Sequence, residues 1–240
     1  MSERSQEKPL VVITGASQGI GEAIAHVFAA HPPVRLALLA RNLNRLEEVR
    51  RALPSNGVEA MVVGCDVTDE TQVAAAAETI ITKWGAPSVL INNAGKFVPG
   101  PFTSYSLADF DLMLSTNLRS AFLVTQAFLP LMVSRGRGHI FMMGSVAGLH
   151  AYPGGTGYCA AKFGLTGLTK VLREELKKTG VKVTLVSPGP TVTPSWDGSG
   201  VPEERMMPPE DIARAILSTV HLSSRTVVED LVLLPQEGAL

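Results

Sequence analysis

The sequence has little cysteine, no excess of charge of either sign and no long apolar run. Its 240 residues include only two cysteines, Cys65 and Cys159, whose spacing suits neither a metal site nor a disulfide framework. We interpret them as reduced thiols of a cytoplasmic protein. The formal net charge of −1 predicts no attraction to nucleic acid or to an anionic membrane. No apolar run reaches the roughly 20 residues that cross a bilayer, and residues 1–8 form a polar N-terminal tail without a signal core.

Apolar segments of strand length alternate with longer helical patterns. Hydrophobic residues make up 45% and charged residues 18% of the chain, as in a globular protein. The strand candidates are continuous apolar runs, typical of strands buried on both faces: Pro9–Thr14, Val34–Ala40, Val58–Gly64, Ser88–Asn92, Gly138–Gly144, Val181–Ser187 and Asp230–Leu234. The helical candidates are Ile20–Ala30, Leu43–Leu53, Glu70–Trp84, Leu107–Ser134, Thr156–Thr179 and Pro209–Val220. This alternation predicts one α/β domain over residues 1–240, a doubly wound Rossmann fold whose seven-stranded parallel sheet has helices on both faces.

Two segments stand out from this regular pattern. Residues 188–208 are rich in Pro, Gly and Ser, and a loop of about 20 residues is unusual unless it covers or binds a ligand. We interpret it as a substrate loop that orders around its ligand. The stretch Leu107–Ser134 holds more apolar residues than one sheet face needs. A thick core would explain this, but we favour a helix that partly faces another subunit of a homodimer or homotetramer.

A glycine-rich turn follows the first predicted strand and opens a helical pattern. It reads Thr14-Gly15-Ala16-Ser17-Gln18-Gly19-Ile20-Gly21. Gly15 would permit the tight turn, Gly19 would let the backbone approach a pyrophosphate, and Gly21 would let helix and strand pack closely. The helix would then offer its first N–H groups to the phosphates. An ordinary strand-to-helix turn is the alternative, but the position after the first strand favours a dinucleotide site.

The end of the second predicted strand bears on the choice between NAD and NADP. An acidic residue there would bind the ribose hydroxyls of NAD, whereas a basic residue would accept the 2′-phosphate of NADP. The strand ends Leu39-Ala40-Arg41-Asn42 and holds no acid. The Arg41 guanidinium can fork onto a phosphate, and Ser17 could add a hydrogen bond. We therefore predict NADP(H), although Arg41 could instead begin a solvated helix face together with Arg45.

Tyr158 and Lys162 are four residues apart in a predicted helix, with Ser145 upstream at the end of a predicted strand. An unperturbed tyrosine has a pKa of about 10. A lysine ammonium one turn away favours the phenolate, so we expect it to lower the pKa of Tyr158. Such a pair can exchange a proton with a carbonyl or alcohol oxygen, and Ser145 could donate a hydrogen bond to that oxygen. Each residue alone has an ordinary structural explanation, but their joint order favours a catalytic group.

Together these motifs resemble the short-chain dehydrogenase/reductase family over nearly the whole chain. The resemblance rests on the glycine turn, Cys65-Asp66-Val67, Asn92-Asn93-Ala94-Gly95, Asn117, Ser145, Tyr158, Lys162 and Pro188-Gly189, in this order. It implies that Tyr158 transfers the proton, that Lys162 tunes Tyr158 and binds the nicotinamide ribose, and that Ser145 steadies the substrate oxygen. It also implies that Asn117 interrupts its helix and helps to hold a water molecule that connects Lys162 to solvent.

The same resemblance implies where the ends of the cofactor would lie. Asp66 with Val67 would meet the adenine, and the segment Asn93-Ala94-Gly95 would flank the adenosine. Pro188-Gly189 and Thr193 would border the nicotinamide, whose ring carries the hydride chemistry.

We expect the substrate pocket between residues 144–157 and the substrate loop, with Ser145 and Tyr158 at its base and Trp196 in its wall. The other candidate walls suit an aromatic or partly apolar carbonyl compound; they are Phe97, Val146, Tyr152, Met206 and Met207. Three segments are similar to bacterial sepiapterin reductases of the family, which implies a pterin side-chain ketone as substrate; they are Thr193–Trp196, Met206–Ile212 and Ser224–Glu229.

Three alternatives compete with this interpretation. A 3-oxoacyl-[acyl-carrier-protein] reductase would need a basic patch at the cleft mouth, for which Arg119, Arg135 and Arg137 are candidates. A non-enzymatic cofactor sensor would not need a tuned phenol such as Tyr158. A dehydratase or epimerase usually needs a further acid or base and a larger substrate domain. We therefore predict an NADP(H)-dependent carbonyl reductase or alcohol dehydrogenase that acts on a small molecule without a metal.

Overall fold

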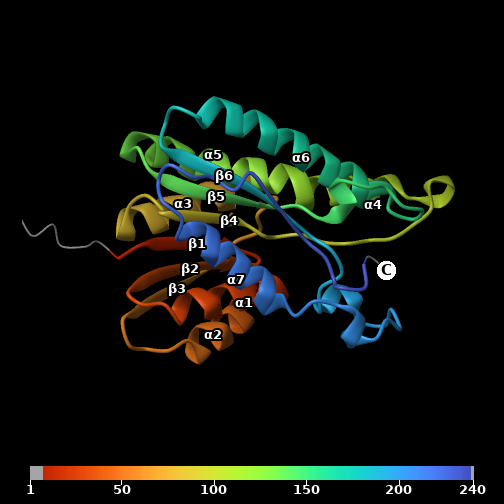
Figure 1. The fold of residues 1–240 in the computed structure, drawn as a ribbon, viewed down its shortest axis with the longest axis horizontal. Coiled ribbons are helices and arrows are strands. Elements are labelled where there is room, and N and C mark those ends of the chain that lie inside the picture. Colours follow the sequence, from red (N-terminus) through yellow and green to blue (C-terminus); the bar gives the residue numbers. More distant parts are fainter. Residues whose placement is uncertain (1–7, 239–240) are drawn as a thin grey trace, which may run out of the picture.

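The computed structural model describes residues 8–238 and contains one parallel sheet with the strand order β3-β2-β1-β4-β5-β6-β7 (Figure 1). The strands are β1 (Leu10–Thr14), β2 (Val34–Ala40), β3 (Val58–Gly64), β4 (Val89–Asn92), β5 (Gly138–Met143), β6 (Val181–Pro188) and β7 (Asp230–Leu233). The helices are α1 (Gly19–Ala29), α2 (Leu43–Ala52), α3 (Glu70–Trp84), α4 (Leu107–Leu114), α5 (Ser120–Arg135), α6 (Thr156–Leu176) and α7 (Pro209–Val220). Residues 1–7 of the predicted polar tail lie outside the described residues.

The inner strands are apolar throughout because both faces of the sheet are covered. In β1, Val11 and Ile13 point into one core, and Leu10 and Val12 point into the other. The first core is closed by α1, α2 and α7, and the second by α3, α5 and α6. Figure 1 shows these two helical layers on opposite sides of the sheet. The predicted doubly wound α/β fold is confirmed.

The direction in which strands are added to the sheet reverses between β1 and β4. From β1 the chain moves outward to β2 and β3, then returns to the other side of β1 with β4. In doubly wound sheets, ligands bind outside the carboxyl ends of the strands at such a reversal. The glycine turn after β1 and the segment Asn93-Ala94-Gly95 after β4 lie at this reversal.

The predicted long helix over 107–134 is divided into two. A π-helical turn, Ser115–Arg119, separates α4 from α5. Its Asn117 side chain donates to the carbonyl oxygen of Met113 one turn back at 3.1 Å and also to the carbonyl oxygen of Lys96 outside the helix at 2.9 Å. A side chain that binds both its own helix and a neighbouring loop is a known cause of such a wide turn.

The substrate loop, residues 188–208, is irregular as predicted but closed at its base. Val192 N–H donates to the Met207 carbonyl oxygen at 2.9 Å, and Met207 N–H donates to the Pro190 carbonyl oxygen at 3.0 Å. Two short 3₁₀ turns, Pro194–Trp196 and Glu203–Arg205, lie within it. These hydrogen bonds therefore hold the two ends of the loop together, next to β6 and α7.

Candidate functional site

The glycine turn is fastened to the loop after β4 by Thr14. This side chain is 2% exposed, and its hydroxyl oxygen accepts the N–H groups of Asn93 and Ala94, both at 3.0 Å. The Asn93 amide donates in return to the carbonyl oxygens of Thr14 and Gly15, at 3.0 and 3.2 Å. Asn93, expected beside the adenosine, therefore uses its amide to hold the turn. Thr14 was not among the predicted site residues, because a threonine at a strand end carries no distinctive spacing.

The glycines of the turn are required by space as well as by conformation. A Cβ on Gly21 would lie 2.2 Å from the carbonyl oxygen of Gly15, and one on Gly15 would lie 2.9 Å from Cα of Ala94. Gly15 and Gly19 also have φ angles of 65° and 59°, a region that favours glycine. The glycines therefore leave the backbone of the turn tightly folded and free of side chains, which lets a phosphate approach it closely.

The amino end of α1 keeps its capacity to bind an anion. Its cap residue Gln18 makes no side-chain hydrogen bond to the helix, whereas α2 and α3 are capped by the side chains of Asn42 and Asp69. Uncapped N–H groups and the positive end of the helix dipole form an anion site. Ser17 and Ile20 are partly buried beside this end. The turn fits a pyrophosphate.

The carboxyl end of β2 holds Arg41 at a shallow, wide-open surface hollow of about 400 Å³, lined by Arg41, Asn42, Leu43 and Asn44. Nearby, the Asp66 carboxylate accepts the N–H and the hydroxyl of Thr68, at 3.0 and 2.8 Å. These bonds, helped by the charge of Arg41, hold the pKa of Asp66 below its ordinary value. Val67, by contrast, is 7% exposed and packs in the core. Of this pair, only Asp66 has a polar side chain to offer an adenine, and Val67 could contribute through its backbone groups alone.

Arg45 reaches from α2 to the glycine turn. Its guanidinium donates a hydrogen bond to the side-chain oxygen of Gln18. In the sequence this arginine looked like part of a solvated helix face, and no spacing signal relates it to a residue so far upstream. The structure thus places a second guanidinium beside the predicted phosphate site.

Ser145, Tyr158 and Lys162 meet at the carboxyl edge of the sheet. Ser145 follows β5 and is hydrogen-bonded to the partly buried Tyr158 side chain. Lys162, one turn further along α6, is 4% exposed, and its Nζ lies 5.5 Å from the centre of the Tyr158 ring. The ammonium donates to the Met143 carbonyl oxygen at 2.7 Å. The three predicted side chains are brought together, with Lys162 anchored to the end of β5.

Burial controls the acidity of this group. Desolvation raises the pKa of Tyr158, and the hydrogen bond from Ser145 acts in the opposite direction. Desolvation also lowers the pKa of Lys162 to about 8. The expectation that Lys162 lowers the pKa of Tyr158 is therefore wrong for this structure. The cause is that the phenol is desolvated while the ammonium is directed to the Met143 carbonyl.

Asn117 joins the group through the loop after β4. It is 2% exposed, and its Oδ1 accepts the N–H of Lys96 at 3.2 Å. A Cβ on Gly95 would lie 2.9 Å from this Oδ1 and 3.9 Å from Nζ of Lys162. Asn117 and Lys162, which the family resemblance connects through a water molecule, therefore both lie next to Gly95.

The residues predicted to border the nicotinamide lie where β6 leads into the substrate loop. Pro188 ends β6, and Gly189 N–H donates to the Leu233 carbonyl oxygen at 2.8 Å. Thr193 crosses the glycine turn, since its methyl carbon would lie 3.2 Å from a Cβ on Gly19. The substrate loop therefore covers the glycine turn where α1 begins.

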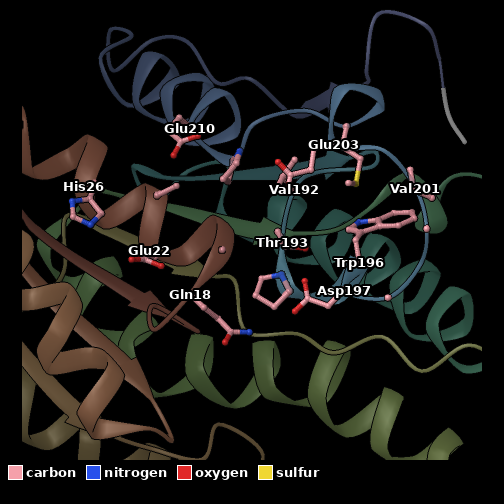
Figure 2. Close-up of a pocket in the computed structure, with 17 residues that line it drawn as sticks. Gln18, Glu22, His26, Val192, Thr193, Trp196, Asp197, Val201, Glu203 and Glu210 are labelled. Carbon is pink, nitrogen blue, oxygen red and sulfur yellow. The ribbon is translucent and has the colours of Figure 1, made fainter.

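A cavity lies beside the substrate loop, away from the predicted substrate pocket over Ser145 and Tyr158. It measures about 820 Å³ and lies between α1 and the substrate loop, where Gln18, Trp196 and Asp197 line it. Figure 2 shows Gln18, Glu22 and His26 on one side, with Trp196 and Asp197 from the loop on the other. Of the residues expected to wall the substrate pocket, Trp196 and Met206 line this cavity. The other expected walls do not line it, and neither do Ser145 and Tyr158.

The position of this cavity beside α1 has a physical reason. Thr193 and Pro194 pack over Gly19, so the loop leans toward α1 and opens its hollow on that side. Phe97 instead packs on Tyr158, with ring centres 5.1 Å apart. The sequence identified aromatic residues near the site but carried no signal for the direction in which the loop folds.

Two further kinds of site were sought in the described residues. Between residues 8 and 238, the side chains of His, Cys, Asp and Glu form no group of three or more that could hold a metal ion. None of the helices in this range combines the length and apolar content needed to cross a bilayer.

Comparison with known proteins agrees with this geometry. The family model described as "short chain dehydrogenase" matches residues 9–201. A sepiapterin reductase from Chlorobaculum tepidum is 37% identical over 96% of this chain and 98% of its own. An alcohol dehydrogenase from Thermococcus sibiricus, solved with 5-hydroxy-NADP, superposes with a TM-score of 0.90 at 30% identity, covering 96% of this chain and 97% of the other. A metagenomic short-chain oxidoreductase in complex with NADP gives a TM-score of 0.83 at 33% identity, covering 95% and 97%.

Proposed function

Because the chain belongs to the short chain dehydrogenase family, oxidoreductases that use nicotinamide cofactors, we propose that it reduces a ketone to an alcohol with NADPH. The observation that carries this proposal is the meeting of Ser145, Tyr158 and Lys162 beside a bare glycine turn at one sheet edge. A proton donor and an anion site at such an edge are what hydride transfer to a carbonyl needs from the protein.

The cofactor would be held along the edge from β2 to β6. The uncapped amino end of α1 would bind the pyrophosphate, and Asp66 would accept the adenine amino group. Lys162 would bind the nicotinamide ribose, and Thr193 would lie near the carboxamide. When bound, the cofactor would supply the hydride.

The protein's own residues would supply the proton and the charge stabilisation. Tyr158 would donate its phenolic proton to the substrate oxygen as negative charge develops there. Ser145, already hydrogen-bonded to Tyr158, would donate to the same oxygen. Lys162 would stabilise the phenolate that remains, after exchanging its bond to Met143 for contacts near the ribose. Asn117 would hold the backbone of Lys96 and a water molecule that returns the proton from solvent.

A preference for NADP(H) over NAD(H) is supported by Arg41. It lines the hollow at the end of β2, where no carboxylate follows the strand. A guanidinium there can donate two parallel hydrogen bonds to the oxygens of a 2′-phosphate. Two similar structures contain NADP or 5-hydroxy-NADP, which supports the same choice.

For the substrate we propose a pterin side-chain ketone. The similarity to a sepiapterin reductase supports it, and so do Trp196 and Asp197 of the substrate loop, whose aromatic face and carboxylate suit a flat, amine-bearing ring. A 3-oxoacyl-carrier substrate has less support, because Arg119 and Arg135 donate to the carbonyl oxygens of Thr68 and Ala86, at 2.7 Å each.

The experiment that tests this function is a panel assay of NADPH oxidation. The purified protein is given sepiapterin, 2,3-butanedione and an acetoacetyl thioester, each with NADPH or NADH. We expect reduction of a ketone with NADPH, fastest with sepiapterin. Binding of NADPH without turnover of any compound would favour the cofactor-sensing alternative. Fastest turnover of the thioester would favour the acyl-carrier alternative.

We also propose a cytoplasmic homodimer or homotetramer. Large apolar side chains remain exposed on the outer helical layer: Phe122 on α5 is 46% exposed, and Phe163 and Val171 on α6 are 45% and 57% exposed. Figure 1 shows both helices on the same side of the sheet. Such exposed apolar surface supports association with a second copy, and light scattering of the purified protein measures it.

A further inference from the structure

We propose that Phe97 is a positioning residue that holds the ring of Tyr158 in the orientation required for proton transfer. The proposal rests on the proposed function, since it assigns Phe97 a role in the reaction of Tyr158. The carrying observation is a ring contact: the two ring centres are 5.1 Å apart and the planes cross at 73°. This edge-to-face arrangement is a favoured and directional geometry for aromatic pairs.

Phe97 lies in the loop after β4, and this loop is fixed on the amino-terminal side of Phe97 by Asn117. The two polar atoms of the Asn117 amide bind both backbone groups of Lys96: Oδ1 accepts the N–H at 3.2 Å, and Nδ2 donates to the carbonyl oxygen at 2.9 Å. The peptide unit that enters Phe97 is thereby tied to the π-helical turn. Asn117 is itself 2% exposed, so this anchor is rigid.

The loop is fixed again on the carboxyl-terminal side of Phe97. The Tyr105 hydroxyl donates to the carbonyl oxygen of Val98 at 2.8 Å. Two residues later, Gly100 N–H donates to the Gly154 carbonyl oxygen at 2.9 Å, and the Thr156 hydroxyl donates to the Gly100 carbonyl oxygen at 2.9 Å. The second anchor therefore ties the loop to the first turn of α6, the helix that carries Tyr158.

Phe97 is thus the one residue between Lys96 and Val98, and both neighbours are held by hydrogen bonds to different elements. These anchors fix the backbone on both sides of Phe97, so its partly buried ring is presented to Tyr158 from a set position. The Tyr158 ring has Phe97 against it and Nζ of Lys162 at 5.5 Å, while its hydroxyl is hydrogen-bonded to Ser145. Phe97 therefore supplies the contact that limits rotation of a ring otherwise held at its hydroxyl.

Proton transfer is sensitive to this orientation. A displacement of about 1 Å at a reacting group can cost about 10²-fold in rate. We therefore expect Phe97→Ala to lower kcat for NADPH-dependent reduction of sepiapterin or 2,3-butanedione by about 10–100-fold, with the dissociation constant for NADPH unchanged. Phe97→Tyr, which keeps the ring, should recover most of this loss, whereas Phe97→Leu, which keeps only bulk, should not.

Phe102→Ala is the matched control. Phe102 belongs to the same connection between β4 and α4 but is 86% exposed, so its removal should leave kcat unchanged. Near-ultraviolet circular dichroism and the thermal midpoint of each variant show whether it is folded. If Phe97→Leu restores kcat as well as Phe97→Tyr does, the ring contact is not what matters and the proposal is overturned.

A double-mutant cycle separates this proposal from the proposed function. If Phe97 acts through Tyr158, then Phe97→Ala should cause almost no further loss in the Tyr158→Phe background. The solvent deuterium isotope effect on kcat should also rise in Phe97→Ala, because proton transfer becomes slower. Full activity of Tyr158→Phe would reject the proposed function. A slow Tyr158→Phe together with a Phe97→Ala variant that raises only KM, or whose isotope effect is unchanged, would reject the positioning role alone.

Discussion

Replacement of Thr14 by valine tests whether the glycine turn depends on its bonds to the loop after β4. The Thr14 hydroxyl oxygen accepts the N–H groups of Asn93 and Ala94 at 3.0 Å each. Valine keeps the shape of threonine but accepts neither bond, and it cannot replace the donation from the Thr14 hydroxyl to the Ile91 carbonyl oxygen at 3.3 Å. Asn93 N–H would retain the Ile91 carbonyl oxygen at 3.1 Å, so the Ala94 N–H is the group left without an acceptor. The perturbation is thus one lost acceptor at the junction of two segments of the proposed cofactor site.

The expected loss of stability follows from the single N–H group, that of Ala94, left without an acceptor. An unsatisfied buried N–H costs about 1–3 kcal/mol, and Ala94 is only partly buried. We therefore expect Thr14→Val to lower the free energy of unfolding by about 1–2 kcal/mol. Urea unfolding followed by tryptophan fluorescence measures it. Because the glycine turn would lose its fixed relation to residues 93–95, NADPH should also bind about 5–10-fold more weakly, equivalent to about 1 kcal/mol.

Thr14→Ser is the matched variant, since it keeps the hydroxyl and loses a buried methyl group. That loss should cost about 1 kcal/mol of stability but leave the NADPH dissociation constant within about twofold. The two variants are thus expected to have similar stability and different affinity. If both bind NADPH equally well, the Thr14 hydroxyl does not organise the cofactor site and this reasoning is refuted.

Four further predictions follow from the site. Tyr158→Phe should bind NADPH normally but lose about 10²–10⁴ in kcat; near-normal turnover would eliminate the mechanism. Arg41→Ala should weaken NADPH by about 1–3 kcal/mol more than NADH, whereas Arg51→Ala at the far end of α2 should affect neither. The pKa of Lys162 is lowered to about 8 from an ordinary 10.5, so the unfolded chain binds more protons than the folded chain between these pH values. The free energy of unfolding of the native chain, relative to that of Lys162→Met, should therefore rise with pH across that window. Urea titrations at several pH values measure this difference, which would not change with pH if Lys162 were not desolvated. Phe122→Glu should lower the subunit number found by light scattering, and an unchanged mass would place the interface elsewhere.

The sequence alone predicted the elements whose causes are local or periodic. Buried parallel strands such as β1 and β2 are continuous apolar runs, and their boundaries were predicted to within a residue. The glycine turn was recognisable because Gly15 and Gly21 satisfy steric requirements that no other residue meets. The order of Ser145, Tyr158 and Lys162 was sufficient to predict that they meet, since strand ends and helix starts of this fold share one edge.

Features that depend on distant contacts could not be predicted in the same way. The bonds from Thr14 to Asn93 and from Arg45 to Gln18 join segments that are far apart in the chain. The position of the loop cavity beside α1 depends on how Thr193 packs over Gly19. The pKa of Tyr158 was predicted in the wrong direction because four-residue spacing gives the proximity of Lys162 but not the desolvation of the phenol.

The raised pKa bears on the protonation state from which Tyr158 would begin the proposed reaction. A desolvated phenol stays protonated at neutral pH, and a protonated Tyr158 is the form that can donate to a carbonyl oxygen. Alcohol oxidation would instead need the phenolate, which requires a positive charge near the phenol oxygen. Lys162 could provide that charge only after leaving the Met143 carbonyl, where it donates at 2.7 Å. In the proposed reduction, Tyr158 would thus begin with the proton that the reaction consumes.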